Sequence, residues 1–127
     1  MSVATGLRGE NLSTVFTLAL DLLELCIHTV MNDKCFPHKF TRELGEPFVA
    51  IAREIMHSVY SADKEKRPEI RIGHIADALV AMNRLQAELH LNFLHFRLKS
   101  RAAKAGEIYD KLQELRSKFI NWSKAVS

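Results

Sequence analysis

Glycine and proline are both scarce in this chain of 127 residues, which holds five glycines and three prolines. Because these two residues mark most turns, their scarcity argues against a fold of many short segments and predicts a few long ones. Hydrophobic residues make up 47% of the chain and charged residues 26%, which is the composition of an ordinary globular protein. A chain of this length fits one domain.

Cysteines and long apolar runs are also lacking. Cys26 and Cys35 match no metal or redox spacing and are too few for a disulfide scaffold, so both are predicted to be reduced thiols. The first residues lack the apolar core of a signal peptide, and no apolar run approaches the roughly 20 residues that span a bilayer. We therefore expect a cytoplasmic protein that is neither secreted nor embedded in a membrane.

Four segments repeat apolar residues at spacings of three and four, the pattern of amphipathic helices, and no strand pattern competes with them. The first helix is predicted to begin near Ser13 and to end near Asn32, after an aperiodic, flexible arm at residues 1–12. The second follows Pro37, the third covers residues 68–96, and the fourth covers residues 104–122. The predicted core positions are Val15, Leu18, Leu22, Leu25, Thr29, Phe40, Leu44, Phe48, Ile51, Ile55, Val59, Ile72, Ile75, Leu79, Met82, Leu85, Leu89, Phe93, Phe96, Ile108, Leu112, Leu115, Phe119 and Trp122.

Four such helices must bury their apolar faces against one another, so the predicted fold is all-α, an antiparallel up-down-up-down four-helix bundle over residues 13–127. Residues 61–67 are aperiodic and are predicted to connect two helices. Pro47 lies within the second helical pattern, just after Gly45, and predicts a kink there or a helix that begins later. Some leucines lie off the main apolar stripes and are expected to stay exposed, which favours a homo-oligomer: Leu20, Leu91, Leu94 and Leu98.

Positive charge is concentrated at the end of the chain. Residues 84–127 hold nine lysines and arginines against four acidic residues, whereas residues 1–83 hold nine against eleven. A local excess of this kind is either a solvated face or a surface for phosphates. The candidate nucleic-acid-binding residues are Arg84, Arg97, Lys99, Arg101, Lys104, Lys111, Arg116 and Lys118.

Motifs for chemistry are few. Glu54 and His57 form one Glu-x-x-His pair of the kind used by di-iron bundles, but the second copy that such a site needs is missing, so no metal is expected. No glycine-rich loop follows a strand, so no cofactor is expected either. Arg84 and His90 have the Arg-x5-His spacing of HEPN ribonucleases, in which histidine exchanges a proton and arginine holds the phosphate. Leu85 stands where that family usually has a polar residue, so we expect no catalysis.

The order of features resembles the accessory variability determinant (Avd) of diversity-generating retroelements and the related four-helix bundle proteins encoded in intervening sequences of 23S ribosomal RNA genes. The resemblance covers about residues 16–125. It rests on FPHKFTREL at the start of the second helix, HSVYSA near its end, ALVAMNRLQAEL in the third helix and KFINWSKA in the fourth. The sequence Gly45-Glu46-Pro47 departs from the family pattern and affects the expected geometry of the second helix.

The resemblance to Avd implies a basic, ring-like homopentamer that binds RNA or DNA with little sequence preference. It also implies binding to the reverse transcriptase of the same locus, which would need this non-enzymatic partner to copy template RNA with errors. The intervening-sequence relatives share the fold, but their role is not established, and this branch remains an alternative. A HEPN-like ribonuclease that uses Arg84 and His90 is the other alternative.

Overall fold

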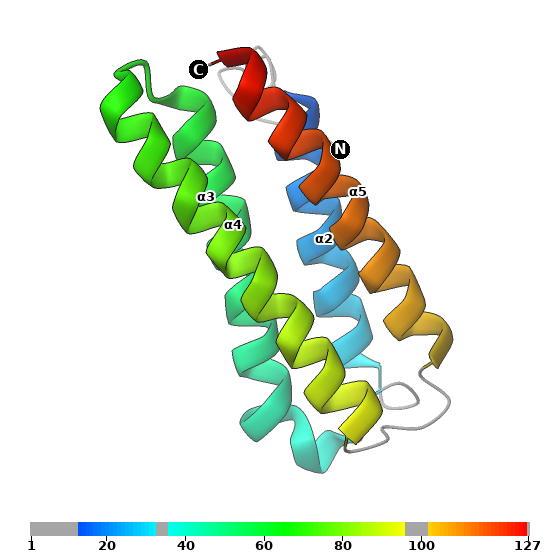
Figure 1. Ribbon diagram of the computed structural model, residues 1–127. Coiled ribbons are helices and arrows are strands. Elements are labelled where there is room, and N and C mark those ends of the chain that lie inside the picture. Colours follow the sequence, from blue (N-terminus) through cyan, green and yellow to red (C-terminus); the bar gives the residue numbers. More distant parts are fainter. Residues whose placement is uncertain (1–12, 33–35, 96–101, 127) are drawn as a thin grey trace, which may run out of the picture.

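The computed structural model describes residues 13–32, 36–95 and 102–126. Nearly all of these residues are helical (Figure 1). Four α-helices dominate: α2 (Thr14–Met31), α3 (Glu46–Lys64), α4 (Pro68–His90) and α5 (Ala102–Val126). Three short helical turns accompany them: η1 (His38–Phe40), η2 (Thr41–Gly45) and η3 (Leu91–His95). The described residues contain no strand, so the predicted all-helical architecture of four long helices is confirmed. The arm predicted for residues 1–12 lies outside the described residues.

Helix α2 begins and ends where the sequence predicts. Ser13 caps its start, because the Ser13 hydroxyl accepts a hydrogen bond of 3.2 Å from the backbone N–H of Phe16. Asn32 ends the helix in an extended conformation. By length and composition α2 is apolar enough to cross a membrane, which was not expected from the sequence. Half of its length is buried inside the protein, where α2 packs against α3 and α5.

The second helical region starts with tighter and wider turns instead of a regular α-helix. A 3₁₀ turn (η1) leads into a π turn (η2), and α3 begins at Glu46, with Pro47 in its first turn. Proline is tolerated there because its missing N–H would have no partner within the helix. The predicted late start is therefore confirmed.

Gly45 is buried at the junction of η2 and α3, where α2 passes close by. A Cβ atom placed on Gly45 would lie 2.6 Å from Cγ1 of Val30 and 3.3 Å from Cε1 of Phe36. The backbone of Gly45 has ordinary helical angles, so this position requires glycine for space and not for conformation.

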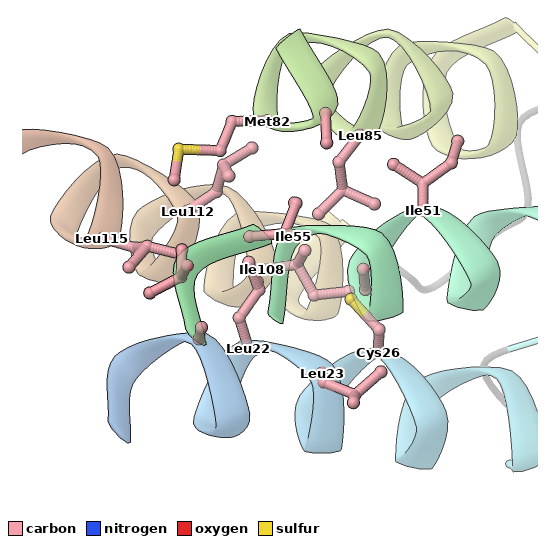
Figure 2. Packing of buried hydrophobic residues seen from close by; sticks show 14 of the residues in the cluster. Leu22, Leu23, Cys26, Ile51, Ile55, Met82, Leu85, Ile108, Leu112 and Leu115 are labelled. Carbon is pink, nitrogen blue, oxygen red and sulfur yellow. The ribbon is translucent and has the colours of Figure 1, made fainter. Parts of the chain in front are cut away.

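Side chains from all four helices meet in one core (Figure 2). Those labelled in Figure 2 are Leu22, Leu23 and Cys26 of α2, Ile51 and Ile55 of α3, Met82 and Leu85 of α4, and Ile108, Leu112 and Leu115 of α5. The predicted aromatic core is confirmed where it is described: Phe93 and Phe119 are buried, and half-buried Trp122 stacks on Phe119 with ring centroids 5.4 Å apart. Phe96 lies outside the described residues.

The prediction that Ile72 is a core residue is wrong, since 61% of its surface is exposed. Ile72 lies six residues before the buried Ala78, which at about 100° per residue places it some 120° around α4 from that residue. Leu20 and Leu91, expected to be exposed, are half-buried. The side chains of Leu94 and Leu98 lie outside the described part of the chain. Among the residues whose side chains are described, the large apolar ones that are exposed are Met31, Tyr60, Ile72, Val80 and Tyr109.

The connection between α3 and α4 is shorter than predicted, because α3 continues to Lys64 and leaves only residues 65–67. Arg67 donates a hydrogen bond to the Glu65 carboxylate and thereby lowers the pKa of Glu65. Arg71 ties this connection to the end of α5: its Nε donates to the Glu65 carbonyl at 2.8 Å and its Nη1 to the Val126 carbonyl at 3.3 Å. Its guanidinium also lies over the Trp122 ring, 6.0 Å from the centroid.

Helix α4 ends earlier than predicted, at His90, and continues as the π turn η3. Phe93 in this turn packs edge-on against Phe36 and Phe48, with ring centroids about 6.3 Å and 6.2 Å away. Its neighbour Asn92 is fully buried, and neither amide atom of Asn92 has a hydrogen-bond partner among the described residues. This end of the core therefore carries a polar group that the sequence pattern did not indicate.

Replacing Gly45 by alanine should destabilise the fold. The new methyl group meets Val30, whose branched side chain has little rotamer freedom in a helix, so we expect a loss of about 1–3 kcal/mol in the free energy of unfolding. Gly106→Ala is the matched control, because a Cβ there meets nothing within 4 Å and alanine favours a helix by about 1 kcal/mol. Urea unfolding followed by far-UV circular dichroism measures both; equal stabilities would contradict the packing at Gly45.

Cys26 should resist alkylation in the folded protein. Burial raises the pKa of the Cys26 thiol from 9.0 to about 12, so the reactive thiolate is absent at ordinary pH. Between about pH 9 and 12 the unfolded chain releases this proton while the folded chain keeps it, so stability should fall as pH rises through that window. Iodoacetamide labelling with peptide mapping, at increasing urea, should modify Cys26 only as the protein unfolds.

Candidate nucleic-acid interface

Five of the eight predicted basic residues lie in the described part of the chain. Arg84 is on α4, and Lys104, Lys111, Arg116 and Lys118 are on α5. The other three, Arg97, Lys99 and Arg101, lie outside the described residues. Several of the five described residues have partners within the protein, so they do not offer five free charges.

Arg84 faces α3. Its Nη1 lies 2.6 Å from Oε2 of Glu54, and both side chains are about half exposed. Exposed ion pairs of this kind stabilise a fold by roughly 0–1 kcal/mol, so the pair mainly sets where the Arg84 charge lies. Because Glu54 neutralises that charge, Arg84 offers little net attraction to a phosphate.

Arg116 joins α5 to α4 through neutral side chains. Its Nη1 donates to Oε1 of Gln86 and to Oε1 of Gln113, each at 3.0 Å, and its Nη2 donates to Oδ1 of Asn83 at 3.1 Å. Gln113 also donates to Gln86 at 3.2 Å. Hydrogen bonds to a charged group are stronger than neutral ones, so Arg116 is primarily a link between two helices.

Three lysines of α5 recur every seven residues and so share one side of the helix: Lys104, Lys111 and Lys118. Lys104 pairs with Glu107 at 3.3 Å and Lys111 with Glu114 at 3.6 Å, each three residues further along. The residue three positions after Lys118 is Asn121, which carries no charge. Lys118 is exposed and has no ion-pair partner among the described residues, so its charge is not balanced by a carboxylate there.

The face between α2 and α5 is acidic. A groove of about 560 Å³ runs between these helices, and Lys111 is its only basic lining residue apart from His28. Its acidic lining consists of Asp21, Glu24, Glu107, Asp110 and Glu114. A polyanion is repelled from this face, so Lys111 is poorly placed for the predicted phosphate contact.

Most of the positive excess comes from the short segment between η3 and α5. Residues 84–127 carry nine basic and four acidic residues, and three of the basic ones are Arg97, Lys99 and Arg101. The rest of that stretch is nearly balanced, with six basic and four acidic residues. The positive excess predicted from the sequence therefore concentrates at residues 97–101, which lie outside the described residues.

The residues considered for catalysis point to different neighbours. Arg84 contacts α3, whereas His90 borders a groove of about 200 Å³ with Ala105, Gly106 and Tyr109 of α5. Within one copy they lie on different sides of α4. In the described ranges, no three His, Cys, Asp or Glu side chains gather as a possible metal site.

Several features of this surface were not found from the sequence. The polar link through Asn83, Gln86 and Gln113 could have been suspected, because uncharged polar residues recur at spacing three on the α4 side that faces α5. The acidic groove combines residues from two helices about 90 positions apart, and no single segment indicates it.

The chain has no significant match to a protein-family model, to a curated protein or to a solved structure.

Proposed function

We propose that this protein is a non-catalytic accessory protein of a diversity-generating retroelement. In this proposal it is an antiparallel up-down-up-down bundle that binds RNA or DNA through phosphate contacts. It also binds the reverse transcriptase encoded at the same locus and supports error-prone copying of template RNA. It acts in the cytoplasm as a homo-oligomer, for which the resemblance to Avd implies a ring of five copies.

The helical architecture is consistent with this proposal, because Avd and its relatives are four-helix bundles. The helix lengths and the three-residue connection between α3 and α4 suit neighbouring helices that run in opposite directions. The reverse transcriptase as partner comes from the resemblance alone.

The observation that carries the nucleic-acid part is the distribution of charge. Arg84, Lys104 and Lys111 have acidic partners, and Arg116 is bound by amide oxygens. Lys118 has no acidic partner among the described residues, and the sequence adds Arg97, Lys99 and Arg101 without a carboxylate between residues 89 and 106. Lysines and arginines of this kind neutralise phosphates without reading bases, so the expected binding is independent of sequence.

The acidic groove between α2 and α5 bears on where nucleic acid approaches the protein. With five carboxylates lining the groove between α2 and α5, nucleic acid is steered away from that side and toward the junction before α5. An oligomer that aligns these junctions would multiply the effect, because each copy adds a net charge of +3.

Neutralising the junction should weaken nucleic-acid binding on every sequence. Replacing Arg97, Lys99, Arg101 and Lys104 by glutamine removes four of the nine basic residues in the stretch 84–127. We expect at least a tenfold loss of affinity, with the slope of log K against log salt on duplex DNA flattened by about 0.9 for each phosphate that the protein no longer neutralises. Fluorescence anisotropy at several salt concentrations measures this.

A matched control removes the same charge elsewhere, by replacing the exposed Lys39, Arg42, Arg53 and Lys64 with glutamine. If both variants lose affinity equally, binding depends on net charge alone and the junction is not the site. Cleavage of the RNA probe that His90→Ala abolishes would instead support the ribonuclease alternative.

The reverse transcriptase of the same locus should co-purify with this protein when template RNA is present. The junction variant should still bind the polymerase if that contact is made by another surface, but should support less cDNA synthesis. Tandem affinity purification with a primer-extension assay measures both outcomes. Failure to co-purify would favour the intervening-sequence branch.

A further inference from the structure

A small groove between α4 and α5 combines apolar and aromatic side chains. It is lined by Leu89 and His90 from the end of α4 and by Ala105, Gly106 and Tyr109 from the first turns of α5. Its volume is about 200 Å³, below the roughly 300 Å³ at which pockets for whole small molecules begin. A groove of this size suits one flat ring of a larger ligand that is also held elsewhere. We call it the α4–α5 groove.

Tyr109 is the side chain that can receive such a ring. It is 43% exposed, and among the described residues no aromatic ring or cation lies over its own ring. The other exposed tyrosine, Tyr60, has the ring of Phe16 4.9 Å away and the ammonium group of Lys64 5.5 Å from its centroid. Aromatic faces favour stacking on other flat groups. Tyr109 therefore presents a ring face that no described ring or cation occupies.

Small residues leave space beside Tyr109. Ala105 and Gly106 lie four and three residues before it, so all three share one side of α5. A Cβ atom placed on Gly106 would meet nothing within 4 Å. On the α4 side, the exposed His90 supplies a second flat ring. Imidazole and phenol rings both stack on nucleobases, so the two walls of the groove suit the same kind of ligand.

The stretch of chain that joins the two walls is basic. No aspartate or glutamate falls between residues 89 and 106, and the basic residues there are Arg97, Lys99, Arg101 and Lys104. Lys104 pairs with Glu107 at 3.3 Å, so the positive excess comes from the other three. By contrast, the groove on the other side of α5, toward α2, is lined by five carboxylates. The α4–α5 groove is thus the one that attracts an anionic ligand.

A flat, partly apolar ring attached to an anion meets both conditions, and a nucleotide is a ligand of that kind. In a duplex the bases are stacked in pairs, whereas in a single strand a base can leave the stack and lie on an aromatic side chain. We propose that the α4–α5 groove binds an unstacked base of single-stranded RNA or DNA on the ring of Tyr109. The inference rests on the nucleic-acid part of the proposed function and adds to it a preference for single strands.

An oligothymidylate and an abasic strand of the same length test the base contact, because they share their phosphates and differ in their bases. In fluorescence anisotropy, the full chain should bind the oligothymidylate about fivefold or more tightly than the abasic strand, as expected for one stacked base. Tyr109→Leu keeps an apolar side chain without a ring, so it should remove this difference and leave binding of the abasic strand unchanged. Tyr109→Phe should bind both strands as the parent does.

Tyr60→Leu is the matched control, because it removes the other exposed tyrosine and should change neither affinity. Gly106→Leu tests the groove with Tyr109 intact. Leucine favours a helix more than glycine does and has space at this position, so the variant should fold and fill the groove. It should weaken binding of the oligothymidylate alone. Far-UV circular dichroism verifies that all variants remain helical.

Equal affinity of the parent for the two strands overturns the inference, and so does a Tyr109→Leu variant that still distinguishes them. Both results leave the proposed function intact, since phosphate contacts alone give that pattern. A parent that binds neither strand nor a duplex overturns the proposed function together with the inference. If Tyr109→Leu loses only the reverse transcriptase in the co-purification, the groove is a protein contact and the inference is wrong.

Discussion

Burial of α2 is the constraint on which the rest of the structure depends. Nine of its eighteen residues are buried, among them Ala19, Leu22 and Cys26 with no exposed surface. Such a helix needs neighbours on more than one side, and α3 and α5 supply them. The close packing around α2 also constrains the residues just before α3. A side chain on Gly45 would collide with Val30 of α2, so this position needs glycine. The irregular turns before α3 are the local consequence of that packing.

Helix α4 is buried on one side only. One side packs into the core through Ala78, Met82 and Leu85, while Ile72 and Val80 on the rest of its surface stay exposed. Between them, Arg84 and Arg116 connect α4 to its neighbours through polar contacts. The described surface also includes the acidic groove between α2 and α5.

Periodicity predicted the helices well, because burial of an apolar stripe leaves its spacing in the sequence. The ends of α2 followed from Ser13 and Asn32, and the late start of α3 followed from Pro47. Ile72 was misplaced because an apolar residue fits either of the two apolar sides of α4, and only the three-dimensional packing distinguishes them. The basic site was predicted less well. Whether a lysine is free depends on neighbours such as Glu107 or Glu54, and pairs across helices leave no local signal.

The two ends of the bundle differ in how well their polar groups are hydrogen-bonded. At one end Arg71 joins the connection after α3 to the last turn of α5. At the other, some 30 Å along α4 at 1.5 Å per residue, the π turn buries Asn92 without a partner among the described residues, at a cost of about 1–3 kcal/mol. Opening the second end would let water reach that amide and recover the cost. Backbone amide hydrogens should thus exchange fastest around η3, and local unfolding should begin at this end of the bundle.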